Sequence, residues 1–480
     1  MNKNDELTAR GFAKKLIGFS MASWLSAALS FVVTPLLTRL YLPEDIGHIN
    51  MFTTYMTFFQ TVCVMALDQT FMRFYNEKLE GLTKFNFLRY CLKINMGIAA
   101  VSVIIILAAH EYFAVQIAGE KSWLIPICLC IVIVASTFLR MSSISSRMEK
   151  NIPLYTLQVV MGTFSEKVII TLIAFAYAQY QTAILSMTVC YACFSVIIFF
   201  MKRKVLYPAN NIPPETNRTI LKFAIPYLPV LLLAWLNNSI PLLVLRKYVD
   251  YSSIGIYTNA VTMANILTIV QTGFSAYWEP FIYEHYKDKN NKEKIRKIEK
   301  TIIGGLIFAA VCIVLLQDII YLLVGEKFRA SKVFFPFLML TPICNSIADM
   351  EGIGIKLSNK NYLNIFAFIG NTFVNLLFSY LLVPRIGVMG AGIAVGISAI
   401  VMVIIRSFLG RKYYKINDKN KFIFWALIIM GMTCIANAII ESSERKFIVI
   451  FILLLILCLI FKKEIYYIRN IFIRELKRRH

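Results

Sequence analysis

The sequence predicts an all-α integral membrane protein with fourteen transmembrane helices, arranged as two six-helix lobes and a C-terminal helix pair. Of its 480 residues, 58% are hydrophobic and 16% are charged, and the mean hydropathy is +0.66. A water-soluble fold of this length has no core large enough to bury that much apolar surface. We therefore expect the chain to lie in a membrane.

Apolar runs of roughly 20 residues recur along the chain, and each is long enough to cross ~30 Å of hydrocarbon as a helix. The fourteen runs cover residues 16–38, 48–68, 91–109, 123–141, 154–177, 182–201, 220–243, 255–279, 301–323, 333–355, 363–383, 389–410, 422–440 and 447–466. They predict an N-terminal lobe over residues 1–201, a cytoplasmic linker over 202–219, a second lobe over 220–415, and an extra helix pair with a basic tail over 416–480.

A long internal repeat is the reason for predicting two lobes. The first helical hairpin bends at Pro43, and Arg39 stands eight residues before Gly47. A relaxed copy has Arg246 nine residues before Gly255. In a chain of apolar helices, a repeat of such long period indicates a duplicated transporter rather than a solenoid.

The distribution of basic residues predicts the orientation of the chain. With the N-terminus inside, about four times as many Lys and Arg residues fall on inside segments as on outside loops. We therefore expect both termini in the cytoplasm. The net charge of +23 then follows from the basic inside segments, which attract anionic lipids, and it needs no nucleic-acid partner.

The ten cysteines all fall within predicted helices and form no disulfide framework.

Candidate site residues first occur near the inner ends of helices two and four. Arg73 follows helix two and belongs either to an interfacial cap with a surface ion pair or to a substrate-facing cavity. In helix four, one face carries Ser136, Arg140, Ser143 and Arg147. That face is either a solvated extension of the helix or a grip for a phosphorylated headgroup, whose oxygens suit a guanidinium group.

Helix five contains the strongest anomaly. Glu166 and Lys167 lie about 20 Å from its inner end, near the bilayer centre. Adjacent helical residues point in different directions, so the two are poor partners for each other. Either they line a water-filled cavity, or they pair with another helix.

The second half of the chain adds polar residues to the predicted interior. Asn237 and Asn238 stand among the prolines of helix seven and predict an irregular helix that faces the protein. Glu279, beside Trp278 at the end of helix eight, and Asp349, on a polar stripe of helix ten, are candidates for proton or sodium coupling. Packing between helices is an equal alternative for Asp349.

Four short motifs resemble those of bacterial polysaccharide flippases in the multidrug/oligosaccharidyl-lipid/polysaccharide exporter superfamily. They are Thr38-Arg39-Leu40-Tyr41-Leu42-Pro43 with Gly47, Phe223-Ala224-Ile225-Pro226 with Pro229, Ile254-Gly255-Ile256-Tyr257, and Leu382-Val383-Pro384 with Gly390-Ala391. The resemblance covers about residues 8–415 and rests on the order and spacing of the motifs together with the number of predicted helices.

The resemblance implies a flippase for surface polysaccharides such as O-antigen. Such a protein carries an undecaprenyl-pyrophosphate-linked oligosaccharide repeat unit from the cytoplasmic to the outer leaflet of the bacterial inner membrane by alternating access. A polysaccharide polymerase and a chain-length regulator are the expected partners. The helix-one motif places Arg39 among the headgroup-binding residues, and the repeat adds Arg246. Position alone adds Arg73, Arg140 and Lys167.

The main alternative is a cation-coupled multidrug exporter of the same superfamily, with Glu166, Asp349 and Glu279 as its coupling acids. The longest predicted outside loop, residues 110–122, leaves no room for the catalytic domain of a membrane enzyme, so we expect a transporter. No G-x-x-x-x-G-K-[ST] motif for nucleotides occurs, and we expect neither a cofactor nor a metal ion.

Overall fold

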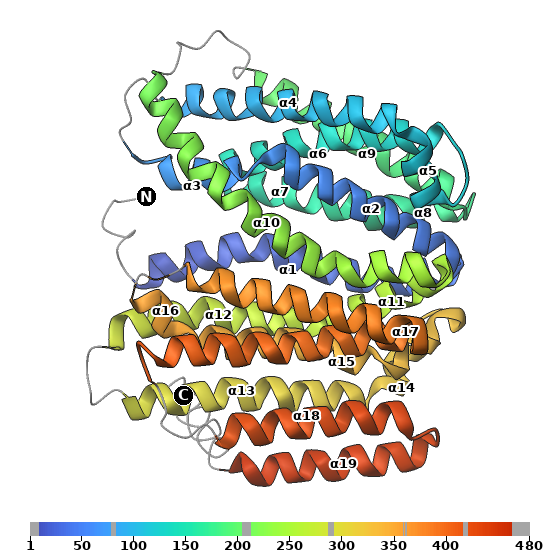
Figure 1. The fold of residues 1–480 in the computed structure, drawn as a ribbon, viewed down its shortest axis with the longest axis vertical. Coiled ribbons are helices and arrows are strands. Elements are labelled where there is room, and N and C mark those ends of the chain that lie inside the picture. The colour runs from blue at the N-terminus through green and yellow to red at the C-terminus, as the bar shows by residue number, and fades with distance from the viewer. Residues whose placement is uncertain are drawn as a thin grey trace, which may run out of the picture. The chain divides into compact units, whose positions relative to one another are not determined.

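The computed structural model describes residues 9–77, 83–203, 213–286, 292–358, 360, 362–415 and 421–462, and every regular element among them is a helix (Figure 1). The chain forms two compact units, here called the first unit (1–242 with 250–255) and the second unit (243–249 with 256–480). The chain passes from one unit to the other within α10 (Pro214–Tyr248).

The first unit is a bundle of long helices broken by shorter ones. Besides most of α10, it contains α1 (Ala9–Leu40), α2 (Pro43–Val64), α3 (Leu67–Phe74), α4 (Lys84–Ala108), α5 (His110–Ala118), α6 (Leu124–Met148), α7 (Ile152–Thr163), the π-helical segment η1 (Phe164–Val168), α8 (Ile169–Ala174) and α9 (Tyr180–Met201). Helix α6 is the centre of this bundle, since it packs against α2, α4, α7 and α9 and is mostly buried.

The second unit is built around the pair α15 and α17, which make its most extensive helix contact. Its elements are most of α11 (Tyr251–Ala264), then α12 (Ile266–His285), α13 (Lys292–Leu315), α14 (Gln317–Leu323), the 3-10 segment η4 (Glu326–Val333), α15 (Phe335–Glu351), α16 (Ile353–Leu357), α17 (Leu363–Arg411), α18 (Lys421–Ile439) and α19 (Ser443–Ile460). The last two helices pack on each other and on α13 (Figure 1).

Ten helices in the described part of the chain are long and apolar enough to cross a membrane, or eleven if η4 and α15, bent by 57° at their junction, count as one span. Each of the fourteen predicted runs overlaps at least one helix among the described residues, and several runs cross a break between two helices. The number of spans is smaller for physical reasons. Helix α2 contains His48, Asn50 and four threonines, α19 begins with three charged residues, and α17 contains two predicted runs in one element.

The predicted hairpin at Pro43 is confirmed. Helix α1 ends at Leu40, and α2 begins at Pro43, whose fixed φ and missing N–H suit the first position of a helix. The Tyr41 hydroxyl in the bend donates to the Ile170 carbonyl at 2.9 Å, and Tyr41 is buried. The hairpin is therefore anchored to α8.

The first turns of α2 and α11 cross at two glycines. A Cβ added to Gly47 would overlap the Tyr251 carbonyl oxygen, and one added to Gly255 would overlap the Pro43 carbonyl oxygen. Each contact residue lies four positions before the opposite glycine. The two glycines occupy equivalent places in the sequence repeat, so the two copies of the motif meet there in a reciprocal contact.

The predicted turn between helices eleven and twelve is also confirmed, although α17 runs as one element across it. The backbone is non-helical at Ile386 and Gly387, and Gly387 has φ +57° and ψ −135°, a conformation open to glycine. A Cβ at Gly390 would lie 2.6 Å from the Leu382 carbonyl carbon, so only glycine lets the following helix fold back this closely.

The structure corrects the predicted loop 110–122 and the predicted irregularity of helix seven, and it shows where α10 and α13 begin. The outside loop 110–122 contains the helix α5, which ends at Gly119 with φ +79°. Helix α10 already begins at Pro214, within the predicted linker, whose residues 204–212 lie outside the described part. The helix of Asn237 and Asn238, predicted to be irregular, is continuous across its three prolines. Finally, α13 begins at Lys292, because the helix extends past its apolar run into the charged segment.

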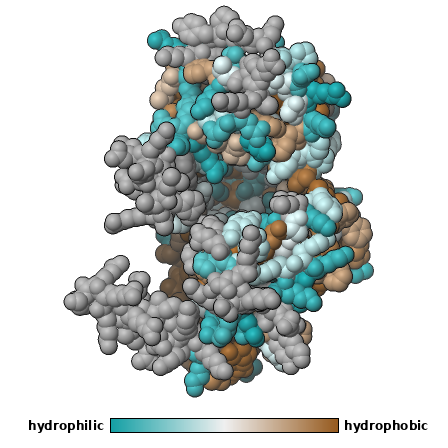
Figure 2. All heavy atoms as spheres, turned by 90° about the vertical axis from the view of Figure 1, so that its left-hand side faces the viewer, coloured by the Kyte–Doolittle hydropathy of each residue, from teal (hydrophilic) through white to brown (hydrophobic). Residues whose placement is uncertain are grey.

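Large apolar side chains are exposed on many helices. The most exposed include Phe408 at 79%, Ile439 at 72% and Leu459 at 71%. This pattern is expected for helices that face lipid. Hydrophilic side chains, drawn in teal, are frequent at the helix ends that Figure 2 turns toward the viewer.

Candidate functional site

The helix that carries Glu166 and Lys167 is interrupted at these residues. Helix α7 ends at Thr163, residues Phe164–Val168 form the π-helical segment η1, and α8 begins at Ile169. A single π turn is less favourable than a continuous α-helix and is often found at functional positions. The segment packs against α1 and α9. The two predicted residues therefore lie at a local irregularity that the sequence pattern did not indicate.

The two charges of η1 have different environments. The Tyr191 hydroxyl of α9 donates to Glu166 Oε1 at 2.7 Å, and Tyr191 is buried. Lys167 is half-buried, and no described residue forms a hydrogen bond with its ammonium group. The charge that acts on it is the adjacent Glu166. Glu166 thus has a partner on another helix, whereas Lys167 keeps its donors for water or a ligand.

Arg140 of the helix-four face is held by an acid. Its Nη2 lies 2.9 Å from Asp68 Oδ2, with the Arg140 side chain 47% exposed and the Asp68 side chain 4% exposed. Asp68 follows a left-handed turn at Met65 and Ala66, which separates α2 from α3. The Gln69 backbone N–H also donates to Asp68 at 2.8 Å. Burial of the carboxylate and exposure of the guanidinium leave part of Arg140 open to solvent.

Arg73 and Arg147 lie at the surface. Arg73 forms an ion pair with Glu77, and its side chain is 56% exposed. Arg147 is exposed, and its guanidinium carbon lies 5.9 Å from the centre of the Tyr155 ring. Surface ion pairs and exposed cation–π contacts contribute at most about 1 kcal/mol, so neither guanidinium is strongly fixed.

The remaining predicted residues occupy three helices. Arg39 is exposed at the end of α1, and Arg246 lies in the last turn of α10. Asn237 is half-buried and Asn238 is exposed on α10. Glu279 belongs to α12, but its side chain lies outside the described residues. Neighbouring Trp235 donates from Nε1 to the Thr57 hydroxyl at 3.2 Å, which joins this part of α10 to α2.

Asp349 in the second unit is paired with a residue that the sequence analysis missed. Arg406 Nη1 donates to Asp349 Oδ1 at 2.8 Å, and the Arg406 side chain is only 9% exposed. Arg406 lies near the end of the predicted apolar run 389–410, and nothing in its local sequence indicates a partner. Arg406 belongs to α17 and Asp349 to α15, so their contact depends on how these two helices pack, which the sequence pattern does not show.

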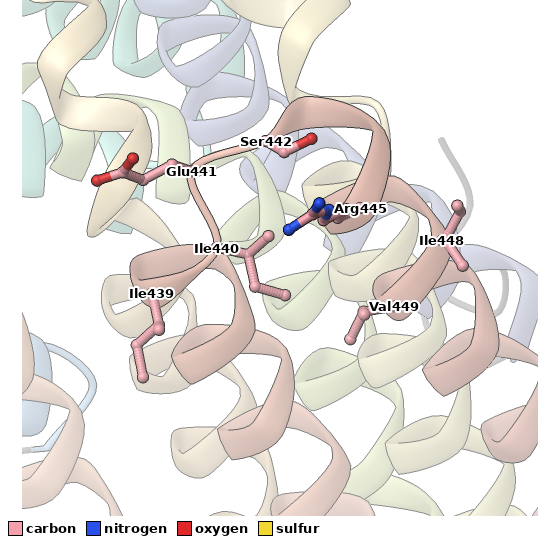
Figure 3. A pocket seen from close by; sticks show the side chains of 7 residues that line it. All are labelled: Ile439, Ile440, Glu441, Ser442, Arg445, Ile448 and Val449. Carbon is pink, nitrogen blue, oxygen red and sulfur yellow. The ribbon is translucent and has the colours of Figure 1, made fainter.

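Two pockets occur away from these residues. A groove of about 480 Å³ between α4, α6 and α9 carries Arg89, Lys93 and Lys202 above apolar side chains. Burial lowers the pKa of Lys202, and the nearby Glu149 carboxylate acts in the opposite direction. A second pocket of about 680 Å³ lies where α18 turns into α19, and Glu441 points away from it (Figure 3). Neither pocket is lined by a predicted site residue.

Comparison with known proteins identifies the family. The polysaccharide biosynthesis protein family matches residues 12–284, more than half of the chain. The chain belongs to the polysaccharide biosynthesis protein family. This result confirms the relationship that the four sequence motifs indicated. As a member of this family, the chain is 23% identical to the capsular polysaccharide biosynthesis protein CapF of Staphylococcus aureus over 398 residues, which cover 80% of this chain and 95% of CapF.

Solved structures show which fold this polysaccharide biosynthesis protein shares. The lipid II flippase MurJ in its inward closed conformation is 17% identical and has a TM-score of 0.68, over 94% of this chain and 99% of MurJ. An inward-facing multidrug resistance MATE family transporter of the MOP superfamily is 15% identical and has a TM-score of 0.60, over 80% and 94%. The fold is therefore that of a multi-pass membrane transporter.

Proposed function

We propose that this protein is a flippase for an undecaprenyl-pyrophosphate-linked oligosaccharide repeat unit, which it moves from the cytoplasmic to the outer leaflet by alternating access. Membership of the polysaccharide biosynthesis family supports a glycan cargo. The similarity to CapF, named as a capsular polysaccharide protein, and to MurJ, named as a lipid II flippase, supports a lipid-linked one.

The proposal rests mainly on the position of Lys167 within a membrane span and on its surroundings there. Its ammonium lies within a membrane span, where a cation without a counter-charge is costly and marks a substrate path. Its neighbour Glu166 is already bound by Tyr191. A pyrophosphate headgroup supplies the missing anionic partner, whereas a cationic drug would be repelled. Arg140, which is partly exposed beside Asp68, is a further cation for the same headgroup.

The proposal includes an architecture and an orientation. We place fourteen spans in the bacterial inner membrane, with lobes at 1–201 and 220–415, the linker at 202–219, the extra pair at 416–480, and both termini in the cytoplasm. The apolar tail of the cargo stays in lipid while the sugars and pyrophosphate cross inside. The polysaccharide polymerase, the chain-length regulator and anionic lipids are proposed partners on the basis of the same family relationship.

Deleting the gene tests the proposed function. Lipid-linked glycan is expected to accumulate on the cytoplasmic leaflet while the surface polysaccharide disappears, and the intact gene should restore both. A Lys167→Ala gene should fail to restore them at matched protein level. Lys121→Ala is the control, because this lysine is 71% exposed and paired with Glu111 at the surface.

The alternative is a cation-coupled exporter, which the MATE-like fold favours. It predicts intact surface polysaccharide in the deletion strain together with increased sensitivity to cationic drugs. In that case Glu166 and Asp349 become the residues to replace first, and the proposal for Lys167 is wrong.

A further inference from the structure

The second unit contains a carboxyl group with no donor. Glu299 of α13 has a relative exposure of 0%, and neither of its two carboxyl oxygens accepts a hydrogen bond from any residue in the described part of the chain. An ionised carboxylate in that condition is destabilised by several kcal/mol relative to water. The group must therefore be neutral, or another group must compensate its charge.

The nearest group is a second carboxyl. Glu351, at the end of α15, is the group whose charge and hydrogen bonding act most strongly on Glu299, and α15 packs against α13. Two carboxylates cannot form a hydrogen bond with each other, since both only accept. Their contact becomes favourable when one of them holds a proton and donates it to the other.

The charges around Glu299 and Glu351 are best balanced when the two carboxyl groups together hold one proton. The Arg411 Nε of α17 donates to Glu351 Oε2 at 2.7 Å, and the Glu351 side chain is 3% exposed. Lys300 is the other cation that acts on Glu299, but its amine lies 5.0 Å above the Phe422 ring. One guanidinium, one carboxylate and one carboxylic acid sum to zero charge. Lys300 acts on Glu299 less strongly than Arg411 does, so with two carboxylates the one guanidinium in contact would leave a buried negative charge poorly compensated.

Close packing of the helices prevents them from moving apart to reduce the repulsion between the two carboxyl groups. A Cβ on Gly410 would overlap the Glu351 carbonyl oxygen and would lie 2.7 Å from the Cα of Gly352, so the backbones of α15 and α17 are in contact at this point. Arg406, one turn earlier on α17, is engaged by Asp349. The other helices packed on α13, namely α12, α14, α18 and α19, present no further charge to Glu299 among the described residues.

A metal ion does not fit these ligands. No group of three or more His, Cys, Asp or Glu side chains suitable for a metal occurs in the described residues. Ca²⁺ and Mg²⁺ require about six oxygen ligands, and the guanidinium next to Glu351 would repel a cation. A proton needs only the two facing carboxyl oxygens.

We propose that Glu299 and Glu351 form a proton-binding site that joins α13, α15 and α17. The bound proton lies between the two carboxyl groups, and Arg411 holds the accepting one. Release of this proton places two like charges in contact and weakens the junction of three helices, so the occupancy of the site changes their packing. The inference does not depend on the cargo.

Infrared spectroscopy of the full-length protein in lipid nanodiscs tests the site without any transport measurement. At neutral pH the wild type should show the C=O band of a buried carboxylic acid, which shifts in D₂O. Glu299→Gln and Glu351→Gln should each lose that band. Glu293→Gln, on the same helix but in a surface pair with Lys297, should keep it.

Arg411→Gln provides the second test. Removing the guanidinium takes away the ion pair at 2.7 Å that holds Glu351 as a carboxylate, so a second acid band should appear at the same pH. The proposal is overturned if the Glu299→Gln and Glu351→Gln spectra equal the wild-type spectrum, because both carboxyls are then ionised in the native protein. It is also overturned if the wild-type band appears only after sodium is removed, since the site then binds Na⁺. Either glutamine variant suffices if the other fails to fold.

Discussion

Replacing Tyr191 by Phe is expected to impair transport without removing a predicted cargo ligand. The Tyr191 hydroxyl donates to Glu166 at 2.7 Å, and Tyr191 is only 5% exposed. Phenylalanine keeps the ring and removes this donor. The remaining side chain that lowers the energy of the Glu166 carboxylate is then Lys167. The carboxylate, with its donor gone, should attract the neighbouring Lys167 ammonium more strongly through their opposite charges, and the cargo then competes less well for this ammonium group.

The size of the effect follows from the lost hydrogen bond. A hydrogen bond to a charged group contributes about 1.5–3 kcal/mol, or about 10- to 150-fold in an equilibrium constant. Loss of this free energy changes by the same amount how strongly Glu166 competes with the cargo for the Lys167 ammonium group. Because η1 is half-buried and water can replace the phenol, the lower value applies. We expect transport to fall about tenfold at limiting cargo.

The assay is the rate at which lipid-linked glycan becomes accessible on the outer leaflet, at matched amounts of protein in the membrane. The double variant Tyr191→Phe with Glu166→Gln separates charge from packing, because a glutamine cannot neutralise Lys167. It should recover most of the wild-type rate. If it is as impaired as Tyr191→Phe alone, competition for Lys167 is not the cause and the argument fails.

Four other substitutions test the rest of the fold and site. Lys167→Ala and Arg39→Ala should each abolish surface polysaccharide while the protein stays in the membrane, and normal polysaccharide in both would contradict the site assignment. Arg140→Gln should lower the free energy of unfolding by about 1–3 kcal/mol, since it leaves a buried carboxylate unpaired, and adding Asp68→Asn should recover most of this loss in thermal unfolding in detergent. Gly47→Ala should cost about 1–3 kcal/mol in the same measurement, because its methyl group would overlap the backbone of α11.

Matched controls exist for two of these changes. An added methyl group at Gly97 would meet no atom within 4 Å, so Gly97→Ala should leave the unfolding temperature unchanged or raise it slightly. Arg73→Gln removes an exposed ion pair and should change stability by at most about 1 kcal/mol. A large loss in either control would show that the assay does not resolve the contacts described here.

The helices could be predicted from sequence because membrane spans depend on local composition. Each run needs only enough apolar residues in a row, and the breaks at Pro43 and Gly387 are set by the conformations of single residues. The same local reasoning placed Glu166 and Lys167 in the middle of a span. It could not supply the partner Tyr191, which lies on the next long helix.

Glu299 shows most clearly what the local composition of the sequence cannot predict. It stands in a segment rich in charges that precedes the predicted apolar run 301–323. The helix extends through that segment, and its periodic burial turns Glu299 inward while Lys297 remains 54% exposed. Which charge of a basic segment is buried depends on the helices packed beside it, and no property of the single residue reveals this.

The reciprocal contact of Gly47 and Gly255 has a consequence for the history of the chain. A duplication normally leaves each copy free to change separately. At this crossing each glycine rests on the backbone of the other copy, so a larger residue at either position displaces both. The second substitution should then cost less than the first, and the two positions behave as a single thermodynamic unit. Under the proposed duplication, neither copy can lose its glycine as an independent event, so the motif is expected to persist in both halves while their other residues diverge.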